Sequence, residues 1–294
     1  MYARAPMRVS FGGGNTDVEP YRSDCGGNTL GMAINKYAYA SIAENGNTES
    51  PLVTAIRNKL GYYDKLEVNS EAKPFSGLGA SGAMAIAAIR LITNGRMDRK
   101  KMAHLAFEVE REDLGVKGGF QDQVFAAFGG FQYLEFGKDR FSILPMTENG
   151  FSKRLEDSCL LVYLGPRQDN MMIHEDEAQR TKENTDTLDT IKEIGNDMRY
   201  YARRGNFDEF ANLLHFAWFE KRRLSPLVST PDIDEYYSEV MRHGALGGKL
   251  CGAGGGGHMI LLCKDPGKVW SISEKMGYHP ETVKIDWEGV KVYK

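Results

Sequence analysis

The stretch "KPFSGLGASGAMAIAAIRLI", residues 73–92, carries the clearest structural signal in this chain. Its glycines Gly77, Gly79 and Gly82 lead into an almost wholly apolar segment, residues 80–94, which predicts a buried helix. Glycines at a helix N-terminus let the backbone approach a phosphate, because free N–H groups and the positive end of the helix dipole point toward it. The stretch therefore predicts an anion-binding loop, with tight helix packing without a ligand as the structural alternative.

The same letters match G-x-G-x-x-G, the fingerprint of dinucleotide-binding proteins. That fold needs a strand running directly into the first glycine and an acidic residue about 20 positions later, at the end of the next strand. Here Pro74 and a loop separate Gly77 from the candidate strand at 66–68, and Asp98 opens a predicted helix at 98–114 as its N-cap. The context disfavours an NAD-dependent dehydrogenase, and without a G-x-x-x-x-G-K-[ST] motif an ordinary P-loop is excluded.

Composition limits the classes of function. The chain has 294 residues, enough for two lobes, and its 41% hydrophobic and 26% charged residues are typical of a soluble globular protein. A net charge of −3 offers no basic footprint for nucleic acid or an anionic membrane. No apolar run approaches the roughly 20 residues of a membrane helix, and the N-terminus has no signal-peptide pattern. The scattered cysteines indicate free thiols in a cytoplasmic protein: Cys25, Cys159, Cys251 and Cys263.

The order of elements indicates an α+β protein of two lobes. Short strand-like pieces dominate residues 1–70, and the composition turns polar around 145–157, where we place the boundary. The expected domains are an N-terminal lobe, 1–152, and a C-terminal lobe, 153–294. Most of the 33 glycines lie in clusters between apolar segments, as expected for loops that approach a ligand or another segment closely.

Two residues outside the glycines suggest a magnesium site. Ser81 stands where a P-loop places its Ser or Thr, with a hydroxyl available to Mg²⁺. In the predicted helix at 98–114, Glu110 falls inside the apolar arc, whereas Glu108 and Glu112 point away from it. A buried carboxylate must be paired, protonated or bound to a metal. A Mg²⁺ shared with Ser81 and an internal salt bridge both account for Glu110.

Asp122 is the candidate for proton chemistry. It follows two glycines in "GGFQDQ", residues 118–123, and it is flanked by amides that can hydrogen-bond it. An acid presented on a glycine loop suits a general base or a group that orients a hydroxyl. An Asx-turn or an N-cap for the short helix that follows explains the residue equally well.

Three motifs match one superfamily in order and spacing. They are "PMRVSFGGGNTD" at 6–17, "PFSGLGASGAMAI" at 74–86 and "KLCGAGGGGHMILL" at 249–262, with "FQDQVFAAFGG" at 120–130 between them. Over nearly its whole length the chain resembles the galactokinase, homoserine kinase, mevalonate kinase and phosphomevalonate kinase (GHMP) superfamily. Within it, the chain looks most like the branch containing D-glycero-D-manno-heptose 7-phosphate kinase, and fucokinase and galactokinase segments are also similar.

The resemblance implies a fold and a set of site residues. The fold would be a ribosomal-protein-S5-like N-terminal lobe and a ferredoxin-like C-terminal lobe, with the active site between them. Asp122 matches the family's catalytic acid, Arg8 its basic residue near the reacting hydroxyl, and Ser81 and Glu110 its Mg²⁺ ligands. The ATP-binding loop would be Ser76, Gly77, Leu78, Gly79, Ala80, Ser81, Gly82 and Ala83. The substrate-binding residues would be Gly14, Asn15, Thr16, Asp17, Gly254 and Gly255.

The chain departs from the family pattern in three ways. Ala80 and Gly82 replace serines of the second motif, so backbone N–H groups must supply more of the phosphate contacts. Asn15 replaces the third glycine of the heptose-kinase first motif, where its amide either alters specificity or holds the turn in a left-handed conformation. No basic cluster marks a sugar-phosphate pocket, and the candidate contacts are Arg167, His174 and Lys36.

The expected reaction is transfer of the γ-phosphoryl group of MgATP to a sugar or sugar phosphate, at the anomeric hydroxyl. The alternatives are a fucokinase, galactokinase or mevalonate-type kinase, a non-catalytic sugar sensor on the same fold, and the disfavoured dehydrogenase. The expected partner is a small molecule, with neither nucleic acid nor membrane, in a monomer or homodimer. The sequence leaves the acceptor and the oligomeric state open.

Overall fold

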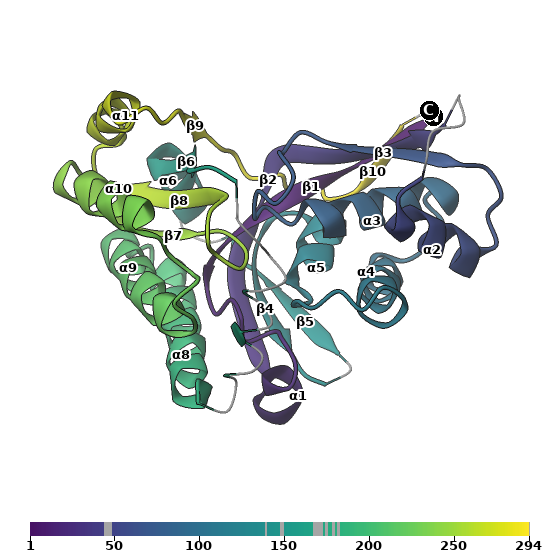
Figure 1. The fold of residues 1–294 in the computed structure, drawn as a ribbon, viewed down its shortest axis with the longest axis horizontal. Coiled ribbons are helices and arrows are strands. Elements are labelled where there is room, and N and C mark those ends of the chain that lie inside the picture. The colour runs from purple at the N-terminus through teal and green to yellow at the C-terminus, as the bar shows by residue number, and fades with distance from the viewer. Residues whose placement is uncertain are drawn as a thin grey trace.

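A computed structural model describes residues 1–43, 49–138, 140–147, 150–166, 173, 176–177, 180 and 183–293. In this part of the chain, two antiparallel sheets lie in two lobes, each lobe with its own helices (Figure 1). The mixture of antiparallel sheets and separate helices confirms the expected α+β class.

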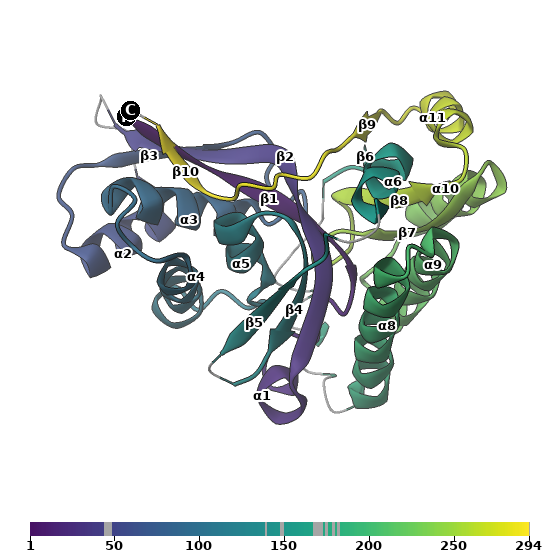
Figure 2. The same cartoon turned by 180° about the vertical axis from the view of Figure 1, so that it is seen from behind.

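The sheet of the N-terminal lobe has the order β10-β1-β2-β4-β5, with β3 pairing with β2. Helices α2 to α5 cover one of its faces, and α8 of the C-terminal lobe packs against β1 and β2 on the other (Figures 1 and 2). Because both faces are covered, β1 is buried along almost its whole length. The strands are β1 (Tyr2–Gly12), β2 (Gly27–Ile42), β3 (Leu66–Ser70), β4 (Phe131–Phe136), β5 (Phe141–Pro145) and β10 (Lys291–Tyr293). The helices are α1 (Tyr21–Cys25), α2 (Pro51–Leu60), α3 (Ala80–Ile92), α4 (Arg99–Glu108) and α5 (Gln121–Phe128).

The sheet of the C-terminal lobe has four strands in the order β7-β8-β6-β9. The strands are β6 (Cys159–Tyr163), β7 (Ala245–Leu250), β8 (His258–Cys263) and β9 (Pro280–Thr282). The helices of this lobe are α6 (Phe151–Ser158), α8 (Thr185–Arg203), α9 (Phe207–Arg223), α10 (Pro231–Arg242) and α11 (Pro266–Lys275). The β7–β8 connection is the glycine run of the third motif, and it faces the N-terminal lobe, where the backbone N–H of His258 donates to the carbonyl oxygen of Ser76 at 2.9 Å.

The elements around the opening stretch form as predicted. Helix α3 is buried from Gly82 through Leu91 on nearly all sides, which confirms the apolar helix. Asp98 is the N-cap of α4, where its carboxylate accepts from the backbone N–H groups of Lys100 and Lys101 at 2.9 and 3.3 Å. Asp98 therefore does not end a strand, as the dinucleotide fingerprint requires. Helix α2 was not expected, although Ser50 as N-cap and Pro51 at the first position are standard start signals.

The helix expected over 98–114 is not one continuous α-helix. Helix α4 ends at Glu108, and a π-helical turn, η1 (Val109–Asp113), follows it. The backbone N–H of Leu114 donates to the carbonyl oxygen of Val109 at 3.1 Å, which is the i→i+5 pattern of that turn. A π-turn carries an extra residue per turn, so it redirects the side chains that follow it, and Glu110 lies on it.

The end of the chain returns to the N-terminal lobe. Strand β10 pairs antiparallel with β1, and Ile285 and Val290 are buried in the core of that lobe. The two termini consequently lie side by side (Figures 1 and 2). The expected boundary at 152/153 falls inside α6 and stays a prediction, and the last segment leaves the C-terminal lobe after β9 to join the sheet of the N-terminal lobe.

All four cysteines are free thiols, as predicted, and three of them are buried whereas Cys25 is exposed. Among the helices of the described ranges, none combines the length and the apolar character needed to cross a membrane.

Candidate active site

A cavity of about 460 Å³ opens where the two lobes meet. Its walls come from β1, the loop before α3, η1, the segment before α5 and, from the C-terminal lobe, α9, β7 and the third motif. Most of the predicted site residues converge here, from segments up to 114 positions apart in the chain.

The loop before α3 has the backbone geometry expected of an anion-binding loop. Gly77 and Gly79 have φ of 84° and 74°, values that side chains other than glycine rarely adopt, and Gly79 caps α3 without a side-chain hydrogen bond. No side chain therefore competes for the first N–H groups of the helix. Gly257 of the third motif packs directly against the backbone of this loop. A side chain would not fit there, because a Cβ on Gly257 would lie 2.6 Å from the carbonyl oxygen of Ser76.

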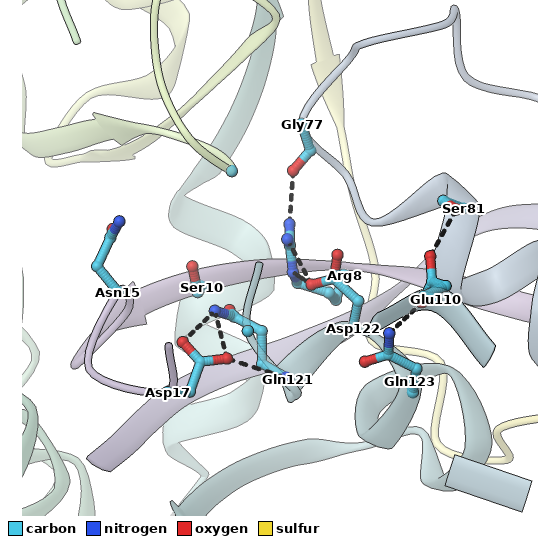
Figure 3. Close-up of polar contacts among 12 residues, drawn as sticks. Arg8, Ser10, Asn15, Asp17, Gly77, Ser81, Glu110, Gln121, Asp122 and Gln123 are labelled. Carbon is cyan, nitrogen blue, oxygen red and sulfur yellow. Dashed lines mark hydrogen bonds and ion pairs between the residues drawn. The ribbon is translucent and has the colours of Figure 1, made fainter. Parts of the chain in front are cut away.

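An Arg8–Asp122 ion pair lies beside this loop. The Arg8 guanidinium donates from Nε to Asp122 Oδ1 at 2.7 Å, and Nη1 donates to the carbonyl oxygen of Gly77 at 2.5 Å (Figure 3). The Arg8 side chain is only 5% exposed, whereas that of Asp122 is 25% exposed, so the carboxylate faces the cavity. Asp122 lies in the first turn of α5 and not at its N-cap, which is Phe120. The N-cap interpretation of Asp122 is therefore wrong.

Ser81 and Glu110 meet on the other side of Asp122. The Ser81 hydroxyl donates to Glu110 Oε1 at 2.6 Å, and the Gln123 amide donates to the second carboxylate oxygen (Figure 3). Glu110 is 3% exposed, yet no cation pairs with it anywhere in the described residues. The alternative that Glu110 forms an internal salt bridge is therefore wrong. The prediction that Glu110 lies on the buried side of the helix is confirmed.

This pair fits a Mg²⁺ ion shared with a ligand. A buried carboxylate without a cationic partner, next to a hydroxyl at the start of a helix, is the donor set with which proteins hold Mg²⁺ against substrate phosphates. No group of three or more His, Cys, Asp or Glu side chains in the described part of the chain could hold a metal ion by itself. The remaining ligands would thus have to come from the bound nucleotide and water.

Asp17 is a second buried carboxylate on the same cavity. It accepts from the backbone N–H and the side-chain amide of Gln121, both at 3.1 Å (Figure 3). Burial raises the pKa of the Asp17 carboxyl, the Gln121 hydrogen bonds lower it, and the Asp122 charge raises it further. The amides that flank Asp122 in the sequence therefore hold Asp17 and Glu110 instead of Asp122.

Asn15 holds the turn, as its sequence position suggested, and its amide lines the cavity. Its φ is 77°, so it holds the turn in a left-handed conformation. Its amide also lines the cavity, where Oδ1 accepts from Lys221 Nζ at 3.1 Å and Nδ2 donates to Glu177 Oε2 at 3.1 Å.

Comparison with known proteins agrees with this geometry. The model of the GHMP kinase N-terminal domain matches residues 47–130, and that of the GHMP kinase C-terminal domain matches residues 198–281, together more than half of the chain. The chain belongs to the GHMP kinases. It is therefore a phosphotransferase with a hydroxyl acceptor, and the dehydrogenase interpretation is excluded.

Several relatives match this GHMP kinase over nearly its whole length. D-glycero-alpha-D-manno-heptose 7-phosphate kinase of Campylobacter jejuni is 27% identical, with 99% of this chain and 98% of the relative covered. Galactokinase of Thermotoga maritima is 25% identical, with 94% and 93% covered. The crystal structure of a D-glycero-D-manno-heptose 1-phosphate kinase from Bacteroides thetaiotaomicron superposes with a TM-score of 0.80 at 24% identity, with 100% of this chain and 99% of the other covered, and shows the same fold.

Not every predicted residue of this GHMP kinase reaches the cavity. Thr16 is fully buried and donates to the carbonyl oxygen of Gly13 at 2.7 Å, so it holds the first motif in shape. Gly254 and Gly255 pack behind the wall against Val228, because the third motif turns there. The predicted residues that line the cavity are Arg8, Gly14, Asn15, Asp17, Ser76, Gly77, Gly79, Ala80, Ser81, Glu110 and Asp122, and the third motif contributes Gly252 and Ala253, which were not predicted. The predicted residues outside the lining are Leu78, Gly82, Ala83, Thr16, Gly254 and Gly255.

The sequence analysis missed the two buried lysines of the cavity lining, Lys221 and Lys249. Lys221 lies within the basic end of α9, which resembles a solvated helix face, and Lys249 opens the third motif, which is known for its glycines. Of the cations proposed as phosphate contacts, Lys36 pairs with Glu281 at 2.6 Å and is not part of the lining, whereas Arg167 and His174 lie outside the described residues.

Proposed function

We propose that this protein transfers the γ-phosphoryl group of ATP to the anomeric hydroxyl of a sugar phosphate, D-glycero-D-manno-heptose 7-phosphate or a close analogue. The observation that carries the proposal is the Asp122 carboxylate, held by Arg8 beside the phosphate loop and open to the cavity. The heptose 7-phosphate kinase that matches end to end supports the choice of acceptor.

The donor side of the site is formed by the loop and by the Ser81–Glu110 pair. The glycine loop and the N-terminus of α3 would bind the phosphates of ATP, with Ser81 and Glu110 as protein ligands of Mg²⁺. When bound, that ion neutralises charge on the transferring phosphoryl group. Arg8 keeps the loop and Asp122 in register, because one guanidinium donates to both.

The acceptor side is formed by Asp122 and Asp17. Asp122 would accept or orient the proton of the attacking hydroxyl, and Arg8 would stabilise the charge that develops there. Asp17, positioned by Gln121, has oxygens that can accept hydrogen bonds from further sugar hydroxyls. Because phosphoryl transfer demands little covalent chemistry from a protein, positioning by these groups should supply most of the rate.

The test is an ADP-release assay across a panel of sugars and sugar phosphates, with the Asp122→Ala variant. We expect turnover to fall about 10²- to 10⁴-fold, while affinity for ATP stays nearly unchanged. Asp98→Ala is the matched control: it removes an aspartate from the start of α4, costs about 1 kcal/mol of stability, and should leave turnover intact.

Two results would contradict the proposal. Near-normal turnover of Asp122→Ala would show that the reaction does not need that carboxylate. Saturable sugar binding without ADP release for any acceptor would make the protein a sugar sensor on a kinase fold. Phosphorus NMR of the product identifies the phosphorylated hydroxyl.

A further inference from the structure

Two buried lysines line the cavity and have no part in the proposed transfer. Lys249, on β7, is 4% exposed, and Lys221, on α9, is 3% exposed. Lysine is almost never this buried unless it is paired or used, since removing an ammonium from water is costly.

The surroundings of Lys249 leave its charge poorly compensated. Its Nζ has two hydrogen bonds, to the carbonyl oxygen of Ser10 at 3.3 Å and to Ser10 Oγ at 3.4 Å, both long for such bonds. Throughout the described ranges, no carboxylate forms an ion pair with it. Burial, together with the charges of Lys221 and Arg8, lowers the pKa of the Lys249 ammonium to about 7, against opposing effects of Cys251 and Asp17. An incoming anion would supply what the protein does not.

Lys249 lies at the acceptor end of the cavity. Arg8 and Ser10 are two residues apart on β1, so their side chains share a face about 7 Å apart along the strand. Figure 3 shows Ser10, Asn15 and Asp17 on one side of the Arg8–Asp122 pair and the Ser81–Glu110 pair on the other. The ammonium that contacts Ser10 is therefore displaced from the reacting centre toward the acceptor, away from the metal ligands.

Lys221 extends the positive charge along the same wall. Its Nζ donates to Asn15 Oδ1 at 3.1 Å and to the carbonyl oxygen of Gly252. Gly14 adjoins Lys249 in the lining, because a Cβ at Gly14 would stand 3.7 Å from Lys249 Nζ, in ordinary contact. This wall of the cavity therefore carries two ammonium groups, and Asp122 lines the same cavity.

We propose that Lys249, assisted by Lys221, binds the phosphate group that the acceptor already carries, so that the enzyme selects a phosphorylated sugar over the free sugar. This inference rests on the proposed function, whose reacting hydroxyl is placed at Asp122. A phosphate accepts several charge-assisted hydrogen bonds at once, and binding it favours the charged form of Lys249. The lysine thus reduces the stability of the free enzyme and gains its partner only when the substrate binds.

The experiment compares the wild type with Lys249→Met, a side chain of similar length without charge. Calorimetry with D-glycero-D-manno-heptose 7-phosphate and with the unphosphorylated heptose, both in the presence of a non-hydrolysable ATP analogue, measures affinity without turnover. In the wild type, the phosphorylated sugar should bind more tightly. In the variant, its dissociation constant should rise about 10- to 100-fold, while those of the free heptose and the ATP analogue stay unchanged.

Folding stability gives a second readout that separates a binding residue from a structural one. A lysine that stabilises the fold would leave Lys249→Met less stable, whereas an uncompensated ammonium predicts a variant as stable as the wild type or more so. Lys275→Met, which removes an exposed charge from α11, is the control for long-range electrostatics and should change neither affinity nor stability.

Four results would overturn the inference: no preference of the wild type for the phosphorylated sugar, an equal loss of affinity for both sugars, a loss confined to the ATP analogue, or lower stability with unchanged binding. The proposed function fails separately. If the phosphorylated sugar binds through Lys249 but no ADP is released, the subsite remains and the kinase assignment falls.

Discussion

The contact between α3 and α5 supports a prediction about Gly82. This glycine is buried in the first turn of α3, and a Cβ there would lie 2.9 Å from Asp122 Cβ and 3.3 Å from the backbone carbon of Asp122. Ordinary contacts begin near 3.4 Å, so Gly82→Ala must push the start of α5 away by about half an ångström. The obstructing atoms belong to a helix backbone and its Cβ, which cannot rotate aside as the end of a long side chain can.

Two effects of opposite sign determine the stability of this variant. Alanine is favoured over glycine within a helix by about 1 kcal/mol. Overpacking a closely packed interior costs about 1–3 kcal/mol. We therefore expect the free energy of unfolding to fall by about 0–2 kcal/mol. A catalytic loss should accompany it, because a shift of this size at Asp122 is expected to lower kcat about 10-fold.

Urea unfolding and the ADP-release assay measure the two quantities on the same preparation. Gly267→Ala is the matched control, since Gly267 is exposed in the first turn of α11 and its nearest new contact would be Asp265 Oδ1 at 3.6 Å. That variant should gain about 0.5–1 kcal/mol and keep the wild-type kcat. If Gly82→Ala were as stable as the Gly267 variant and fully active, α5 would not be held against α3, and the reasoning would fail.

Two further predictions concern the buried carboxylates. In Glu110→Gln, the Mg²⁺ concentration for half-maximal activity should rise about 10- to 100-fold, while stability holds or improves because a buried charge is removed; an unchanged Mg²⁺ dependence in the ADP-release assay would refute the ligand role. Asp17→Asn tests the sign of a pKa shift. The folded-state pKa of Asp17 is raised above its usual value of 3.8, so the unfolded chain loses its proton first and wild-type stability falls as pH rises through the window above 3.8. The variant lacks this term, so its unfolding free energy should improve relative to the wild type between pH 4 and neutrality, and a parallel pH dependence of the two proteins would contradict the shift.

Local patterns explain which parts of the site could be predicted from the sequence. The buried helix α3, the glycines before it and the Asp98 cap each depend on residues within about one helical turn, where the chemistry of the backbone N–H groups is decided. The burial of Glu110 also followed from helical periodicity, although its direction depends on a π-turn that periodicity does not reveal.

The partners of the carboxylates could not be predicted in the same way. Sequence proximity suggested that Gln121 and Gln123 serve Asp122, yet side chains in the first turn of a helix diverge, and the two amides reach Asp17 and Glu110. Asp122 instead pairs with Arg8, which lies 114 positions away. The pairing of β10 with β1 could not be predicted either, because the sequence of a strand does not indicate which distant strand it pairs with.

The sequence by itself therefore determined a glycine loop at the start of a buried helix, the α+β class, and the residue types expected for a metal-assisted phosphoryl transfer. These depend on local backbone chemistry and on the periodicity of burial. Only the tertiary structure decided which charges meet. It brings Lys249 into contact with Ser10, which lies 239 positions away in the chain, and Lys221 into contact with Asn15, which lies 206 positions away. Both lysines are buried because the two lobes meet around one cavity. The charge environment of a side chain depends on what excludes water from it, and in this protein that is the opposite lobe.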